Sequence, residues 1–179
     1  MVKHQEPYSE NTAEEKKLWQ LLDEVNDPEV PVLSVIDLGI IREVKLLPSP
    51  VGEEQEVEVS ITPTYSGCPA MEIIRASIQK TLLHNGYRKV KINTVLSPAW
   101  TTDWMTESGK QKLKAFGIAP PTPKQQVCHS SLFHEEEAIQ CPQCNSYHTR
   151  VISHFGSTAC KALYRCSDCL ETFDYFKCH

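Results

Sequence analysis

Two pairs of cysteines near the C-terminus have the spacing of a metal site. Cys141 and Cys144 form one C-x2-C pair, Cys166 and Cys169 form a second, and 21 residues separate the pairs. Each pair predicts a tight turn that directs two sulfur atoms at one point, and two facing turns make a tetrahedral cage of four sulfurs. Structural zinc is the first choice for such a closed cage, with iron or an iron–sulfur cluster as the alternative. We therefore expect residues 141–179 to form a zinc ribbon.

This C-terminal segment is too short to bury a stable core unaided, so a bound metal would supply its folding energy. Among the cysteines and histidines outside the two pairs are Cys128, His129, Cys160 and Cys178. These four residues could form a second metal site. No compact pair spacing supports that site, and the alternative is that Cys160 packs in the interior while the others are exposed.

Cys68 is the one cysteine in the first 120 residues, and it lies between an expected strand and an expected helix. Pro69 suits the first position of that helix, because an N–H group there would have no intrahelical partner. The N–H donors and partial positive charge of a helix N-terminus favour thiolate, so Cys68 could be a reactive or metal-handling cysteine. The alternative is a small side chain packed at a tight turn. Thr64, Tyr65 and Ser66 offer hydroxyl groups close to it in the sequence.

Three carboxylates could reach the same loop: Asp27, Glu29 and Asp37. They could be metal ligands or acid/base groups. They could equally end a helix and form turns, which the neighbouring prolines and glycine favour. The sequence has no Ser-His-Asp order, P-loop or G-x-G-x-x-G motif, so no common catalytic motif indicates an enzyme.

A short series of elements must position these residues. The apolar spacing and the turn residues predict, in order, a helix over 13–25, strands over 40–47 and 57–61, a helix from Pro69 that Asn85 and Gly86 end, a strand over 90–96 and a helix within 102–116. The fold class is therefore α+β: a small three-stranded sheet with helices on one face, followed by a small zinc-ribbon domain.

Composition divides the chain into four segments. Residues 1–12 are an N-terminal tail and residues 13–119 hold the α+β domain. The segment over residues 120–140 begins with Pro120-Pro121-Thr122-Pro123 and is a linker, and residues 141–179 are the ribbon. Seven of the eight cysteines lie between residues 128 and 178, which supports a boundary at this linker.

Charge and hydropathy argue against two classes of partner. The net charge is −5, and neither domain has the basic excess of a nucleic-acid-binding protein. The sequence contains no run of 18 or more apolar residues, so it predicts no membrane span. Its first residues also lack the apolar region of a secretory signal. We therefore expect a cytoplasmic protein, whose reduced thiols favour metal binding over structural disulfides.

Several motifs resemble known families. D-P-E-V-P-V at 27–32, D-L-G at 37–39 and T-P-T-Y-S-G-C-P at 62–69 resemble the metal–sulfur cluster assembly domain family that includes SufT, over roughly residues 13–118. S-P-A-W-T-T-D-W-M at 97–105, F-G-S-T-A-C-K-A-L-Y-R-C at 155–166 and F-D-Y-F-K-C at 173–178 are more specific. They resemble the D-subunit family, PaaD, of the bacterial 1,2-phenylacetyl-CoA epoxidase system, and this resemblance spans almost the whole chain.

The resemblance implies an accessory protein rather than the catalyst. In that system a di-iron oxygenase and a flavin/iron–sulfur reductase carry out the redox chemistry, and the D subunit is thought to help the reductase acquire its 2Fe-2S cluster. The family's cysteine then corresponds to Cys68, and its acidic motif to Asp27 and Glu29. The implied cargo is transient iron or an iron–sulfur cluster, in addition to structural zinc. The implied partners are the reductase subunit and, as a second candidate, the oxygenase subunits.

Two other functions remain open from the sequence. A non-catalytic subunit of the epoxidase that positions substrate or electron donor would form a stable stoichiometric complex during turnover. A zinc-ribbon adaptor for nucleic acid would need a basic surface, which the charge balance argues against.

Overall fold

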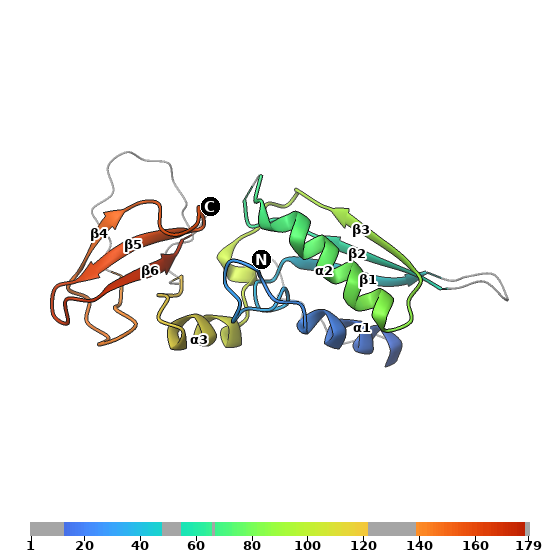
Figure 1. Cartoon of the computed structure of the whole chain (residues 1–179), viewed down its shortest axis with the longest axis horizontal. Coiled ribbons are helices and arrows are strands. Elements are labelled where there is room, and N and C mark those ends of the chain that lie inside the picture. The colour runs from blue at the N-terminus through green and yellow to red at the C-terminus, as the bar shows by residue number, and fades with distance from the viewer. Residues whose placement is uncertain (1–12, 48–54, 66, 122–138, 178–179) are drawn as a thin grey trace.

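The computed structural model describes residues 13–47, 55–65, 67–121 and 139–177, and its strands form two three-stranded sheets (Figure 1). The first part contains α1 (Ala13–Asp23), β1 (Ile41–Leu47), β2 (Glu56–Ile61), α2 (Ala70–His84), β3 (Lys89–Thr94), the 3-10 turn η1 (Thr102–Trp104) and α3 (Glu107–Ala115). The second part contains β4 (Thr149–Ser153), β5 (Lys161–Cys166) and β6 (Thr172–Phe176). This arrangement confirms the expected α+β class.

The first sheet has the order β1-β2-β3, with β1 antiparallel and β3 parallel to β2. Apolar and polar residues alternate along β2, the central strand. Val57, Val59 and Ile61 therefore point to one face of the sheet, where they are fully buried. α1 and α2 pack against the sheet (Figure 1). Their buried residues are Leu18, Trp19, Leu21, Leu22, Ala70, Ile74, Ile78 and Leu82.

Several element boundaries differ from expectation by one residue, as where α2 begins at Ala70 instead of Pro69, and three differences are larger. α1 ends at Asp23, two residues early, and β3 ends at Thr94, so that Leu96 is 65% exposed. The helix expected within 102–116 is divided into η1 and α3. Thr106 causes the division: its backbone is extended, and its hydroxyl accepts a hydrogen bond from the Gly109 N–H at 2.9 Å as an N-cap.

Asp37 joins the turn before β1 to α3. Its side chain is buried, its Oδ1 accepts from the Thr106 hydroxyl at 2.8 Å, and its Oδ2 pairs with the Lys112 ammonium. Burial raises the pKa of Asp37, but hydrogen bonds from Lys112, Thr106 and the Ser34 N–H outweigh it and hold the pKa below its ordinary value. Asp37 therefore has a structural role at the start of α3.

The second sheet is antiparallel throughout, in the order β4-β5-β6, and has its own small core. That core comprises Ala119, Ile139, Cys141, Ala162, Cys166, Phe173 and Tyr175. Ala119 connects the two parts, since its N–H donates to the Asp174 carbonyl at 2.8 Å and its carbonyl accepts from the Phe176 N–H at 3.0 Å. Most of the expected linker, residues 122–138, lies outside the described residues, as does the 1–12 tail. None of the described helices has the length and apolar character to cross a membrane.

Candidate functional site

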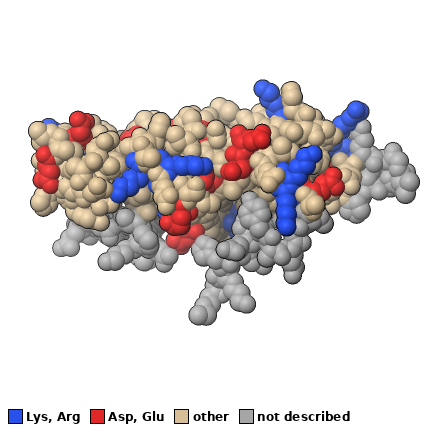
Figure 2. Space-filling model, turned by 90° about the horizontal axis from the view of Figure 1, so that it is seen from below, with Lys and Arg blue, Asp and Glu red and all other residues tan. Residues whose placement is uncertain are grey.

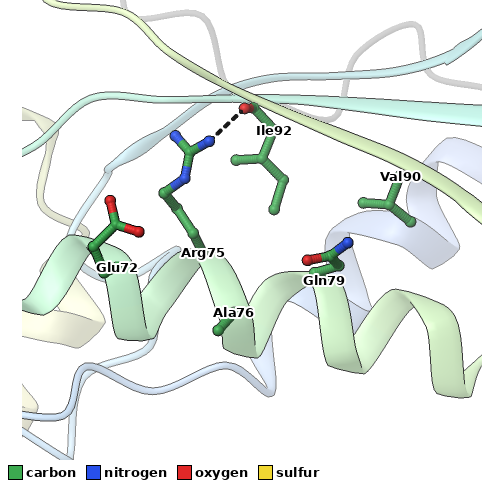
Figure 3. A pocket seen from close by; sticks show the side chains of 6 residues that line it. All are labelled: Glu72, Arg75, Ala76, Gln79, Val90 and Ile92. Carbon is green, nitrogen blue, oxygen red and sulfur yellow. Dashed lines mark hydrogen bonds between the residues drawn. The ribbon is translucent and has the colours of Figure 1, made fainter.

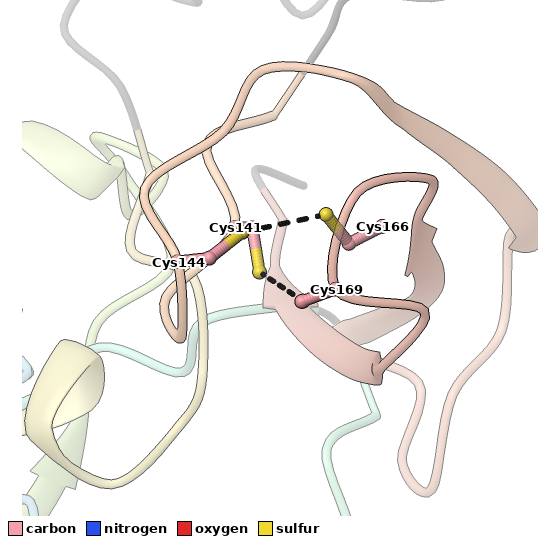
Figure 4. A group of neighbouring side chains, drawn as sticks. All are labelled: Cys141, Cys144, Cys166 and Cys169. Atoms are coloured by element: carbon pink, nitrogen blue, oxygen red, sulfur yellow. Dashed lines mark hydrogen bonds between the residues drawn. The ribbon is translucent and has the colours of Figure 1, made fainter.

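The four cysteines expected to bind metal meet at one point (Figure 4). Their sulfur atoms all lie within 4.8 Å of one another, with 3.7 Å between Cys141 and Cys169 and 3.5 Å between Cys144 and Cys166. A zinc–sulfur bond is about 2.3 Å long, so the corners of a tetrahedral ZnS4 site are about 3.8 Å apart. The cage therefore fits a tetrahedral ion of this size.

The backbone of each cysteine pair forms the tight turn that the spacing predicts. Asn145 (φ 61°) and Leu170 (φ 67°) directly follow the second cysteine of each pair, and both adopt the left-handed conformation that closes such a turn. N–H groups of Cys169 and Asp168 point at the Cys166 sulfur and lower its pKa to about 7, although burial opposes them. Metal ligation requires the thiolate form, so a sulfur that accepts from two N–H groups suits a metal ligand.

Side chains outside the cage hold the two turns together. Asp168 accepts a hydrogen bond from the Ser146 hydroxyl and contacts His148 Nδ1 at 3.1 Å, which lowers the pKa of the carboxyl. The His148 carbonyl accepts from the Ser167 N–H at 2.7 Å. These contacts connect the residues beside one cysteine pair to those beside the other, so they orient the ligands as outer-shell groups do at metal sites.

Cys68 lies on the loop between β2 and α2, two residues before the helix begins. Its side chain is half-buried, its N–H donates to the Tyr65 carbonyl and its carbonyl accepts from the Met71 N–H, both at 3.3 Å. Burial raises the pKa of Tyr65 to about 12, with further contributions from the adjoining Cys68 thiol and the charges of Glu29 and Cys160. These side chains therefore form one neighbourhood.

Asp27 and Glu29 reach this neighbourhood from the loop after α1. Asp27 Oδ1 accepts from the N–H groups of Glu29 and Val30, both at 2.7 Å, so this carboxylate fixes the turn. Glu29 Oε2 accepts a hydrogen bond from the Cys160 thiol at 3.7 Å. The sequence left open whether these acidic residues form a turn or act as ligands. In the structure Asp27 forms the turn, whereas Glu29 contacts a thiol.

Cys160 comes from the ribbon but is buried beside the first domain, at 5% exposure. Its sulfur lies 3.0 Å from the Thr158 hydroxyl. Burial raises the pKa of Cys160 to about 11; Thr158 opposes the rise, and the charge of Glu29 adds to it. The other members of the expected second metal site, Cys128, His129 and Cys178, lie outside the described residues, so that site stays a prediction.

Sequence reasoning did not connect Cys160 to Glu29, because 131 positions separate them. The one available signal was that Cys160 lies outside both C-x2-C pairs, within a long run of residues that resembles a known family.

A shallow groove of about 300 Å³ lies between α2 and β3 (Figure 3). It is lined by Glu72, Arg75, Ala76, Gln79, Val90 and Ile92. The Arg75 guanidinium spans it, donating to the Ile92 carbonyl at 3.0 Å and the Thr94 hydroxyl at 2.7 Å. The lining has no thiol or imidazole, and its volume is at the lower limit for small organic ligands, about 300 Å³. The groove therefore does not indicate a site for a coenzyme-sized substrate.

The surface seen from below carries acidic and basic side chains intermixed, without a large area of one sign (Figure 2). The described side chains on this face therefore offer no continuous basic track of the kind that follows a phosphate backbone.

Two family models define the class of this protein: an iron–sulfur cluster assembly domain followed by a zinc ribbon. Residues 15–93 match the family model described as "Iron-sulfur cluster assembly protein", and residues 125–177 match the "PaaD zinc beta ribbon domain".

The chain belongs to the family of 1,2-phenylacetyl-CoA epoxidase D subunits, as its motifs led us to expect. It is 48% identical over 162 residues to an Escherichia coli K12 protein named for that subunit, covering 90% of this chain and 92% of the relative. The MIP18 family protein F45G2.10 of Caenorhabditis elegans is 29% identical over 90 residues, which are 50% of this chain and 55% of that protein.

Solved structures similar to this chain cover a little over half of it. A domain of unknown function, DUF59, from Bacillus anthracis is 28% identical, with a TM-score of 0.49, and the match covers 55% of this chain and 90% of that one. The conserved hypothetical protein TM0487 from Thermotoga maritima is 24% identical, with a TM-score of 0.45, over 59% of this chain and 97% of that one.

Proposed function

We propose that this chain is an accessory maturation factor of a phenylacetyl-CoA epoxidase, and that it transfers iron or a 2Fe-2S cluster to the reductase subunit. One observation carries the proposal. Cys68 is a half-exposed thiol at the start of α2, with the Tyr65 phenol and the Glu29 carboxylate in the same neighbourhood. It lies in a domain that matches a family model named for iron–sulfur cluster assembly.

The chemistry of these groups suits a carrier. A cysteine thiolate binds soft iron–sulfur species and releases them by ligand exchange with another thiolate. Half-exposure lets the cysteines of a client approach the cargo while it is still bound to Cys68. The turn fixed by Asp27 holds Glu29 in place, where its carboxylate can accept a thiol proton or contact iron. The zinc ribbon would then stabilise the fold and dock the client.

A second candidate function is a positioning subunit of the epoxidase, which the name of the E. coli relative favours. Such a subunit would hold the substrate or the electron donor during turnover. The groove between α2 and β3 is too small for a phenylacetyl-CoA thioester and carries no reactive thiol. We therefore keep this function as the alternative outcome of the experiment below.

The test is co-expression of the reductase with the wild-type chain or with Cys68→Ala. The substitution removes the sulfur but little volume, so the variant should fold and retain its zinc. The reductase should then contain less 2Fe-2S cluster, measured as visible absorbance and as iron per chain, and epoxidase activity should fall in the same proportion. Chemical reconstitution of the purified reductase should restore activity without the accessory chain.

Fully loaded reductase from cells that contain Cys68→Ala would refute the carrier role of Cys68. A requirement for this chain after the reductase has been fully loaded would support the positioning subunit instead.

A further inference from the structure

The ribbon contributes a cysteine to the interior of the first domain. Cys160 and Phe176 are buried at 5% and 2% exposure, and both pack in the large core that α1, α2 and the first sheet build. The small core of the ribbon is formed by other residues. In Figure 1 the end of β6, near the C label, approaches the loop that precedes α2.

Buried contacts fix Cys160 in this place. The Cys160 carbonyl accepts from the Lys177 N–H at 3.0 Å. The Phe176 ring meets the Trp100 ring edge to face at 6.3 Å between centroids, and the Trp100 indole N–H donates to the Leu38 carbonyl at 2.9 Å. Cys160 is therefore held by an aromatic contact between the domains.

The groups around Cys160 are those of a ligand site. Glu29 Oε2 lies 3.7 Å from its sulfur and the Thr158 hydroxyl 3.0 Å, while Tyr65 lies beside Cys68, Glu29 and Cys160. A cysteine that serves only as a small apolar residue needs no carboxylate at its sulfur, because partial burial of a carboxylate costs free energy. The polar neighbours are better explained by a site that receives positive charge.

We infer that Cys160 is a second thiolate ligand, and that Cys68, Glu29 and Cys160 together bind a 2Fe-2S cluster between the two domains. This inference rests on the proposed function and extends it by naming the donor set. Among the described residues, the ribbon cage is the one group of three or more His, Cys, Asp or Glu side chains placed to hold a single ion, so we assign the three donors to a two-iron cluster rather than to one ion. A 2Fe-2S cluster distributes four terminal ligands over two irons. Three donors from this chain leave one terminal position for a cysteine of the client.

The experiment uses the full-length, zinc-loaded chain, reconstituted anaerobically with ferric iron, sulfide and a thiol. The wild type should gain one cluster beyond its zinc, measured as iron and sulfide per chain and as visible circular dichroism. Cys160→Ser and Cys68→Ser should each lose most of this signal, and Glu29→Gln should release iron to a chelator about tenfold faster or more. Ser157→Ala is the matched control: it changes the same loop at a hydroxyl that donates to Asp174 and contacts none of the proposed donors, so it should retain the cluster.

The outcomes separate this inference from the function on which it rests. If Cys160→Ser binds as much cluster as the wild type while Cys68→Ser loses it, Cys160 is a packing residue. The carrier function of Cys68 would then still hold. No cluster on the wild-type chain would contradict both. If Cys160→Ser fails to fold, judged by zinc content and far-UV circular dichroism, Glu29→Gln decides. Wild-type iron retention in that variant would overturn the composite site.

Discussion

Glu29 and Asp27 belong to one acidic motif, yet their side chains have different roles. Asp27 accepts two backbone hydrogen bonds and fixes a turn, whereas Glu29 accepts from a thiol of the other domain. The D-P-E spacing explains the difference. An aspartate reaches the N–H groups two and three positions ahead, and the longer glutamate side chain leaves the turn. A residue's place in a motif therefore does not by itself make it a ligand.

Gly39 occupies a position where a side chain has no room. Its φ is +66°, and an added Cβ would lie 2.0 Å from the Trp104 carbonyl oxygen. Gly86 has a φ of +94° but nothing within 4 Å of an added Cβ. Gly39→Ala should therefore lower the free energy of unfolding by about 3 kcal/mol or more, and Gly86→Ala by about 1 kcal/mol. Urea unfolding of both variants checks this, and equal losses would contradict the close contact at Gly39.

Sequence patterns predicted the elements well where local spacing determines them. The alternation of Val57, Val59 and Ile61 marked β2, and the two C-x2-C pairs marked the four cysteines that meet in the ribbon, because period and spacing are properties of adjacent residues. The division of the last helix was missed, although Thr106 is a common N-cap type. Apolar spacing does not report caps, so a residue-by-residue search for N-caps would have found it.

The junction of α3 with the turn before β1 should depend on pH through Asp37. Its pKa is lower in the folded chain than in the unfolded chain, so its contacts stabilise the native state above about pH 4. That contribution is lost as the pH falls through the folded pKa. The difference in unfolding free energy between wild type and Asp37→Asn should therefore be largest at neutral pH and shrink towards pH 3.

The matched control is Glu107→Gln on the same helix. Glu107 is 81% exposed and forms an ion pair with Lys110, so the substitution should change stability little at any pH. A constant difference between wild type and Asp37→Asn from pH 7 to pH 3 would show that the ionised carboxylate does not stabilise the junction.

The ribbon should depend on its metal for folding. Its own core is small, so we expect most of its stability to come from metal ligation. Cys169→Ser removes one thiolate of four and should abolish zinc binding and tryptic resistance over residues 141–177. Ser167→Ala, within the same turn, retains all four cysteines and should retain zinc. Full zinc content and protease resistance in Cys169→Ser would refute the structural role of the cage.

Docking of the ribbon on the first domain is the feature that no local pattern predicted. Cys160, Phe176 and Trp100 lie far apart in the sequence, and each could have been an ordinary core residue of its own domain. Hydrophobic periodicity predicts that a residue is buried, but it does not predict which element the residue packs against. Only the tertiary arrangement therefore brings Cys160 to Glu29. The domain boundaries at 119 and 141 stay a prediction, and Ala119 already pairs with β6.

Phe176→Ala should loosen this docking while leaving the cage intact. The substitution removes the edge-to-face contact with Trp100 and leaves a cavity, with an expected loss of about 3 kcal/mol. Cys160 should then react with iodoacetamide much faster than in the wild type, measured by mass spectrometry under native conditions. Equal labelling rates would show that Phe176 does not hold Cys160 in place. Tyr147→Ala, at an exposed ribbon position, is the control and should leave labelling unchanged.

The central claim is that this chain carries a cluster to the reductase through Cys68. The most direct measurement is transfer from the reconstituted full-length chain to purified apo-reductase, followed by visible circular dichroism and reductase activity, with an iron chelator present to remove free iron. We predict that the wild type loads the reductase despite the chelator and that Cys68→Ser does not. If free iron and sulfide load the reductase equally well with or without the chain, or if Cys68→Ser transfers as fast as the wild type, the account is contradicted.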